Sequence, residues 1–171
     1  DLKLYSLSNA LIRAHRRGVK VRVVTESDNM DNVETMIPAL KEAGIAVIGD
    51  RREGSMHNKF TVIDRVEVWG GSMNYSYNDT YRSDNNLICI RSTEVAEIYT
   101  TEFNEMFEED RFGPEIGSIT PYPKVSINGT EIEVYFSPDD GVMTHIVDLV
   151  NGAQEVNTLL SAIHQVNDMC H

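Results

Sequence analysis

The sequence predicts an α/β fold with a mixed, largely parallel central sheet flanked by helices. Apolar residues recur at helical spacing over 4–17, and a β-branched run follows over 19–24. A second helical segment and a second strand pattern occupy 31–48. This alternation of helices and strands is typical of parallel sheets. With 171 residues, 41% of them hydrophobic, the chain suits one domain with a real core, or one domain and a fragment.

Local signals predict where the first elements begin and end. Gly18 suits the end of the first helix. Asp31 and Glu34 have capping-box spacing, so they predict the start of the second helix. Pro38 is expected to kink or split that helix, and Gly44 to end it before a strand over 45–48.

The stretch 56–64, Met-His-Asn-Lys-Phe-Thr-Val-Ile-Asp, has the clearest chemistry. Its apolar residues favour a strand, and a period of two then places His57 and Lys59 on the same face. An imidazole can act as a nucleophile or proton carrier near neutral pH, and an ammonium beside it attracts phosphate. Taken alone, such a pair in a strand is more often a solvated polar pair than a site.

A second stretch, Gly70-Gly71-Ser72-Met73-Asn74, supplies small and polar groups. The glycines permit close approach of the backbone, while the hydroxyl and the amide can donate to phosphate oxygens. The segment between the two stretches alternates like a strand. A tight turn near Asp64 and Arg65 would therefore form a hairpin and bring the second stretch beside the first.

The combined pattern resembles the signature of the phospholipase D superfamily, H-x-K-x(4)-D followed by G-S-x-N. His57, Lys59 and Asp64 match the first part. The second part is matched by Gly71, Ser72 and Asn74. The resemblance extends from about Leu7 to Phe112, and more weakly to the C-terminus. It implies the phospholipase D-like sandwich fold.

The resemblance also implies metal-independent phosphodiester cleavage, with no cofactor. His57 would attack phosphorus and form a phosphohistidine, Lys59 and Asn74 would hold the non-bridging oxygens, and Ser72 would assist. Asp64, Gly70 and Gly71 are expected to be supporting or structural.

One position departs from the family pattern. Members often carry an acidic residue after the asparagine that orients the histidine. The nearest candidates here are Asp84 and the amides Asn85 and Asn86, and an amide would orient the histidine less strongly.

Family members place two such motifs around one pocket, from two repeats or from two identical subunits. Only one H-x-K occurs here, so a second copy or a second repeat would have to supply the other histidine. Residues 1–112 are interpreted as the catalytic repeat and 113–123 as a linker. Residues 124–171, a hairpin around Asn128-Gly129 and a helix over 142–150, resemble the opening of a second repeat, or complete the first.

The remaining elements are expected as follows. Residues 75–85 should form a loop at the rim of the site, followed by a strand over 86–90 with Cys89 buried in it. A helix is expected over 95–109, and the acidic run at its end should be solvated.

The composition does not decide between nucleic acid and phospholipid as the substrate. A net charge of −12 weighs against tight non-specific nucleic-acid binding, although Arg51-Arg52 could steer phosphate toward His57. The lack of a basic amphipathic helix weighs against lipid. No segment is apolar enough for membrane insertion, and no signal peptide is visible, so a soluble chain of unassigned location is expected. The alternative to an enzyme of nucleic acid or phospholipid is a half-site fragment or a non-enzymatic binding module.

Overall fold

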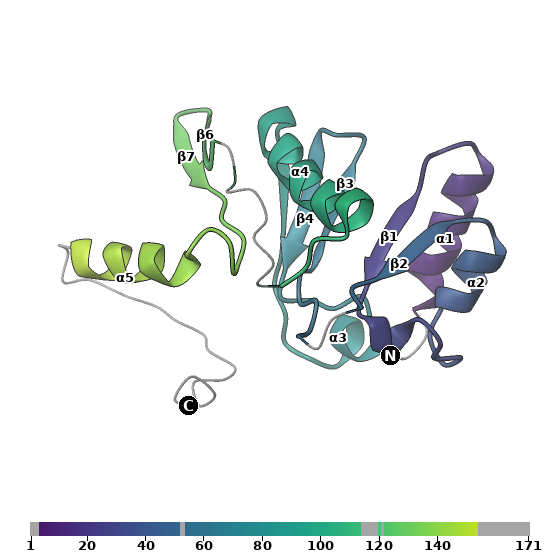
Figure 1. Cartoon of the computed structure of the whole chain (residues 1–171). Coiled ribbons are helices and arrows are strands. Elements are labelled where there is room, and N and C mark those ends of the chain that lie inside the picture. The colour runs from purple at the N-terminus through teal and green to yellow at the C-terminus, as the bar shows by residue number, and fades with distance from the viewer. Residues whose placement is uncertain (1–3, 52–53, 114–119, 121, 154–171) are drawn as a thin grey trace.

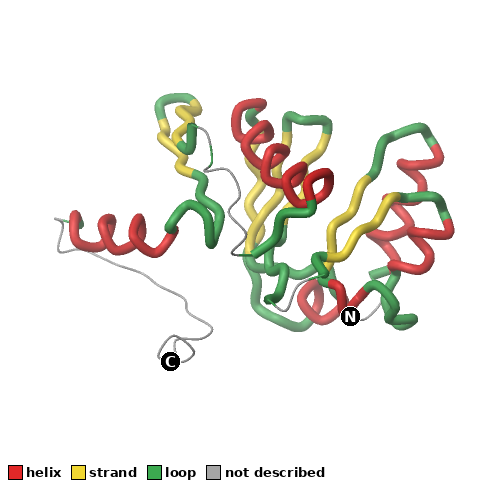
Figure 2. Tube along the Cα trace, viewed as in Figure 1, coloured by secondary structure: helices red, strands yellow, loops and turns green. Residues whose placement is uncertain are grey.

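The computed structural model describes residues 4–51, 54–113, 120 and 122–153. Figure 1 shows three groups of elements along the molecule: α1 and α2 with the β1–β2 pair, then α4 with the strands that include β3 and β4, then the β6–β7 hairpin and α5. Figure 2 shows the same arrangement by type of element. None of the helices in the described ranges has the length and apolar character needed to cross a bilayer.

The first group confirms the predicted alternation of helix and strand. Its elements are α1 (Tyr5–Arg16), β1 (Arg22–Thr25), the 3-10 turn η1 (Ser27–Asn29), α2 (Ile37–Glu42) and β2 (Ala46–Gly49). The two strands pair in parallel, with Arg22 opposite Ala46. Ile37, Leu40 and Ile45 form a small buried core beneath them.

The predicted start of the second helix is wrong, because the polar residues before it form a turn instead. Asn32 Oδ1 accepts a hydrogen bond from the backbone N–H of Glu34 at 2.9 Å, so the capping signal is used locally. The helix begins at Ile37 and places Pro38 in its first turn. A proline there loses no helical hydrogen bond, so the expected kink does not occur.

The second group corrects the expectation of a largely parallel sheet. Its strands β3 (Phe60–Ile63), β4 (Glu67–Gly71) and β5 (Leu87–Arg91) are antiparallel, and among the described strands only β1 and β2 pair in parallel. The short turn between β3 and β4 allows only antiparallel pairing, and the longer connection over 72–86 also returns β5 antiparallel to β4. The predicted hairpin turn is confirmed: Asp64 and Arg65 have φ of 52° and 58°, and Val66 N donates to Ile63 O at 3.1 Å.

Two helices complete this group. The predicted helix is α4 (Thr93–Glu109), which begins at the N-cap Ser92. The rim segment expected to be a loop contains a short helix, α3 (Tyr77–Tyr81).

Two burial predictions are wrong. Cys89 is exposed, because it lies on the face of β5 that carries Trp69 of β4 and not on the packed face. Glu105 of the acidic run is buried rather than solvated.

The third group consists of β6 (Lys124–Ile127), β7 (Thr130–Glu133) and α5 (Val142–Gly152), with the predicted turn at Asn128 and Gly129. Val125, Val134 and Phe136 pack into the main core with Val68 and Val95. The segment 124–136 is therefore attached to the second group by apolar packing. Most of the predicted linker and the tail from 154 lie outside the described residues.

Candidate active site

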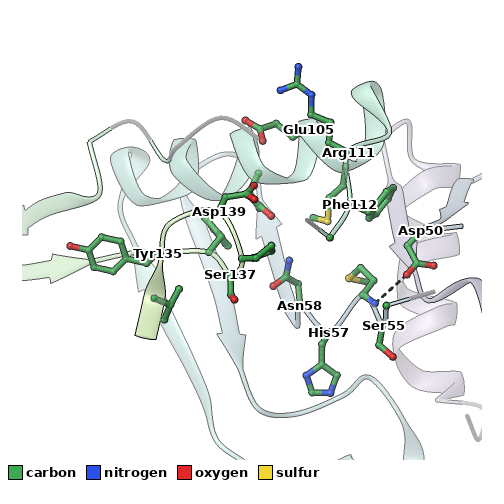
Figure 3. A pocket seen from close by; sticks show the side chains of 18 residues that line it. Asp50, Ser55, His57, Asn58, Glu105, Arg111, Phe112, Tyr135, Ser137 and Asp139 are labelled. Carbon is green, nitrogen blue, oxygen red and sulfur yellow. Dashed lines mark hydrogen bonds between the residues drawn. The ribbon is translucent and has the colours of Figure 1, made fainter. Parts of the chain in front are cut away.

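His57 and Lys59 lie in the extended segment immediately before β3, not within a strand as predicted. The buried carboxylate of Asp50 holds this segment in place, since it accepts hydrogen bonds from Ser27 N at 2.9 Å and from Met56 N at 3.2 Å. Figure 3 shows the second of these bonds as a dashed line. Glu26 also accepts from Met56 N, at 2.9 Å. The side chain of His57 is exposed.

The hairpin brings the two motif stretches together. Gly71 N donates to Lys59 O at 3.4 Å, so β4 ends beside the segment that carries His57. Ser72 and Asn74 follow directly. Asp64 lies at the other end of the hairpin, in the turn.

A cavity of about 410 Å³ lies at this junction. His57, Lys59 and Asn74 line it on one side. Its opposite side is largely apolar and comes from the first group, with Leu4, Leu7, Leu11, Ile37 and Leu40. Ser72 is not among the lining residues.

A second cavity, of about 560 Å³, lies on the other side of His57. Its lining joins the Asp50–Asn58 region to α4 and to the segment after β7. Figure 3 shows His57 at one end of it and Glu105, Arg111 and Asp139 at the other. His57 is therefore accessible from both cavities.

Burial and charge act on Lys59 in opposite directions. Partial burial lowers the pKa of its ammonium group, and the nearby Asp79 carboxylate raises it. Lys59 Nζ donates to His57 O at 2.7 Å, which keeps the ammonium next to the histidine backbone. Tyr75 closes this side of the cavity, and its hydroxyl shares a 2.7 Å hydrogen bond with Thr61 Oγ1.

Of the groups expected to orient the histidine, Asn85 is hydrogen-bonded within the motif region and, among the described residues, Asp84 is not. Asn85 lies next to Ser72, whose Oγ donates to Asn85 Oδ1 at 2.9 Å. Asp84 is exposed, lines neither cavity, and makes no side-chain hydrogen bond or ion pair within the described part of the chain.

Asp79 is a site residue that sequence reasoning missed. Its carboxylate accepts from Asn74 N at 2.9 Å and also from Asn74 Nδ2. A signal for its placement was present, since Ser76 and Asp79 have N-cap spacing: Ser76 Oγ accepts from Asp79 N at 3.2 Å and starts α3.

Glu102 of α4 is a second missed residue. It lines the larger cavity, and its pKa is raised to about 7, first by burial and then by the charges of Glu105, Asp139 and Asp140. Over the described ranges, no group of three or more histidine, cysteine or acidic side chains is placed to hold a metal ion.

Comparison with known proteins gives consistent matches. A family model described as "Cardiolipin synthase, PLD-like domain" matches residues 3–107. The chain is 38% identical over 104 residues to a mitochondrial cardiolipin hydrolase of Xenopus laevis, covering 61% of this chain and 50% of that protein. It is 33% identical over 131 residues to the Homo sapiens protein of that name, covering 74% and 51%. A phospholipase D of Rickettsia felis is 38% identical over 93 residues, covering 54% and 46%. The chain thus spans about half the length of these curated relatives.

Solved structures show the same fold. The crystal structure of Nuc from Salmonella typhimurium, described as a phospholipase D family member, superimposes with a TM-score of 0.54 at 24% identity, covering 64% of this chain and 72% of that one. NucT from Helicobacter pylori gives a TM-score of 0.53 at 22% identity, covering 61% and 72%. The family match takes in both motif stretches and the strands that present them, so this chain belongs to the phospholipase D superfamily.

Proposed function

We propose that this chain carries the catalytic repeat of a metal-independent phosphodiesterase in which His57 is the nucleophile. The observation that carries the proposal is that an exposed imidazole, an ammonium and a side-chain amide, from His57, Lys59 and Asn74, line the same cavity. These are the groups that phosphoryl transfer without a metal requires: a nucleophile, a fixed positive charge and a hydrogen-bond donor.

In the proposed reaction, the His57 imidazole attacks phosphorus and the bond from phosphorus to the leaving oxygen breaks. A phosphohistidine forms, while a second histidine protonates the leaving oxygen. Water or another alcohol then attacks phosphorus and releases His57. Lys59 and Asn74 hold the non-bridging oxygens. Ser72 assists without contacting the substrate, because its hydroxyl donates to Asn85 Oδ1.

The second histidine would come from another copy of the chain or from a second repeat. The H-x-K pattern occurs once in the sequence, so one chain of this length supplies one of the two histidines.

Among phosphodiester substrates we favour phospholipid over nucleic acid. The relatives that match at 33–38% identity are named cardiolipin hydrolase and phospholipase D. The leucine-rich side of the cavity beside His57 suits an apolar substrate group, and the net charge of −12 disfavours a polyanion. Nucleic acid is the alternative substrate.

A second candidate function is a half-site that binds phosphodiesters without turning them over. The observation in its favour is that the chain spans about half the length of its curated relatives. The two candidates differ in whether the purified chain cleaves a phosphodiester.

The test uses bis-p-nitrophenyl phosphate, vesicles containing cardiolipin and single-stranded DNA as substrates. We expect His57→Ala to abolish turnover and Lys59→Ala to reduce it about a hundredfold. Lys20→Ala is the matched control, because Lys20 is exposed and remote from both cavities, and it should leave the rate unchanged. EDTA should have no effect, since Lys59 supplies the positive charge.

Retained turnover in a folded His57→Ala chain would exclude His57 as the nucleophile. Loss of activity on chelation, restored by zinc or magnesium, would exclude the metal-independent mechanism. Binding of these substrates without any turnover would favour the half-site.

A further inference from the structure

The side chain behind Asn74 is a carboxylate. Asp79 Oδ2 accepts from the backbone N–H of Asn74 at 2.9 Å and also from the amide nitrogen Nδ2 of the same residue. The same oxygen accepts both hydrogen bonds, and together they fix the backbone and the side chain of Asn74.

Asp79 is itself fixed by the short helix α3. Its N–H donates to the side chain of the N-cap Ser76 at 3.2 Å, and Ser76 is buried, with 3% of its surface exposed. Ser76 N in turn donates to Asn74 O at 2.8 Å. The carboxylate therefore approaches Asn74 from a rigid turn.

A hydrogen-bonded chain links the backbone of Asp79 to Ser72 through Asn85. Asn85 Nδ2 donates to the backbone carbonyl oxygen of Asp79 at 3.1 Å, and Asn85 Oδ1 accepts from Ser72 Oγ at 2.9 Å. An amide can donate and accept in this way, whereas a carboxylate at position 85 could only accept. Asn85 is thus used as a bridge.

We propose that Asp79 is the positioning residue of this site, acting on Asn74 through hydrogen bonds and on Lys59 through its charge. This proposal rests on the proposed function, in which Asn74 and Lys59 hold the phosphate. Asp79 acts through both of them and does not touch the phosphate itself.

The hydrogen bonding explains how Asp79 would position Asn74. An amide NH₂ group has two hydrogens. With one hydrogen of Asn74 Nδ2 held by Asp79, the rotation of the amide is fixed and the other hydrogen is free to donate to a substrate oxygen. Without an acceptor at 79, the amide could turn its carbonyl oxygen toward the phosphate, which would be repulsive.

The same carboxylate favours the charged form of Lys59. Burial lowers the pKa of Lys59, and the charge of Asp79 raises it. The other titratable groups that line this cavity are His57, Glu26 and Tyr75. Glu26 already accepts from Met56 N, and Asp79 is the group whose charge acts on the Lys59 ammonium.

The test measures Lys59 directly. The Lys59 Nζ signal is assigned in ¹⁵N NMR spectra with the Lys59→Arg variant, and its titration is followed in the wild-type chain, Asp79→Asn, Asp79→Glu and Asp84→Asn. We expect Lys59 to titrate at lower pH in Asp79→Asn. In Asp79→Glu, which keeps the negative charge, it should titrate close to the wild-type pH.

Turnover provides the second measurement. Asp79→Asn should lower kcat about tenfold, and the fall of activity on the alkaline side should move to lower pH. Asp31→Asn is the matched control, because it removes the same charge from an exposed bend outside both cavities, and it should change neither measurement. Thermal unfolding of each variant identifies any general loss of structure.

The outcomes separate this inference from the proposed function. An unchanged Lys59 titration in folded Asp79→Asn overturns the inference, whether or not the chain is active. A larger effect of Asp84→Asn than of Asp79→Asn would also overturn it. A chain that shows the Lys59 shift but cleaves no phosphodiester supports the electrostatic role of Asp79 while excluding the proposed function.

Discussion

At the scale of single residues, Glu102 is placed to make the stability of the protein depend on pH. Its folded-state pKa is raised from 4.5 to about 7, so folding favours the neutral carboxyl. Below pH 4.5 both the folded and the unfolded states carry a neutral Glu102, and there is no penalty. As the pH rises from 4.5 through 7, the unfolded state gains stability by ionising first. Glu102 therefore destabilises the fold above pH 7.

Replacement by glutamine should remove this penalty. The full shift corresponds to about 3 kcal/mol, and solvent screening at this partly exposed site reduces the expected gain to about 1 kcal/mol. We expect Glu102→Gln to raise the thermal midpoint at pH 8 by a few degrees and to change it little at pH 4. Glu97→Gln, an exposed position on the same helix, is the control and should have no pH-dependent effect. An equal gain at both pH values would contradict the assignment.

Single residues also show what the sequence could predict of the site. The proposed site residues His57, Lys59, Ser72 and Asn74 stand in a fixed spacing, so their pattern selects them as candidates without a structure. Asp79 and Glu102 have ordinary neighbours in the sequence. Their roles come from what α3 and the segment after β7 place beside them. The N-cap spacing of Ser76 and Asp79 indicates a helix start, but it does not indicate the contact of Asp79 with Asn74.

At the scale of elements, the end of β4 is constrained by its neighbour β5. A Cβ added at Gly71 would lie 2.3 Å from Asn86 O, a contact that the backbone cannot accommodate without moving. A Cβ at Gly70 would lie 3.6 Å from Lys59 O, an ordinary contact. Of the two adjacent glycines, Gly71 is the one that the pairing of β4 with β5 requires.

The two alanine variants therefore form a matched pair. Gly71→Ala should destabilise the protein by about 2 kcal/mol and reduce activity, because Ser72 follows directly and is bonded to Asn86 N at 3.1 Å. Gly70→Ala should change the free energy of unfolding by less than about 0.5 kcal/mol. Chemical denaturation of both variants measures the difference. Equal destabilisation would show that the separation of β4 and β5 is not what limits residue 71.

Turn chemistry made some elements predictable and others not. The Asn128-Gly129 turn and the Asp64-Arg65 turn were predicted because the strands on either side are short and alternate clearly. The hairpin pattern predicts the antiparallel pairing of β3 with β4, but the helix–strand alternation of the first 50 residues favours a parallel sheet, and the longer connection over 72–86 does not indicate the direction of β5. The start of α2 was missed because Asn32 caps a turn with the same residue types that cap helices.

At the scale of the whole molecule, α5 is a largely uncovered helix within the described residues. None of its residues is buried, and Ile146, Leu149 and Val150 are 47%, 69% and 45% exposed. Exposed apolar helices of this kind are usually covered by another part of a protein or by a partner. Such a partner is also what the proposed reaction requires, because one chain provides a single H-x-K motif.

We therefore expect the chain to associate as its concentration rises, and its activity per chain to rise with it. The double variant Ile146→Glu, Leu149→Glu should weaken association and leave the thermal midpoint of the monomer unchanged, because neither side chain is buried. Asn151→Glu adds a charge to the same helix without removing an apolar side chain, and it should associate like the wild type. Sedimentation velocity and turnover of bis-p-nitrophenyl phosphate, measured over the same concentrations, give the comparison. A monomer with full activity would contradict the need for a second histidine.

The register of β4 and β5 has a practical consequence for observing the site. Trp69, the only tryptophan, lies directly opposite the exposed Cys89. With Cys170 replaced by serine, a quencher attached to Cys89 would lie within contact distance of the indole and suppress its emission. The fluorescence of Trp69 would recover only when β5 separates from β4. The Trp69–Cys89 pair lies two residues from the Gly71–Leu87 pair, which directly precedes Ser72. The protein thus contains the two positions needed for an optical reporter of strand opening beside its candidate active site.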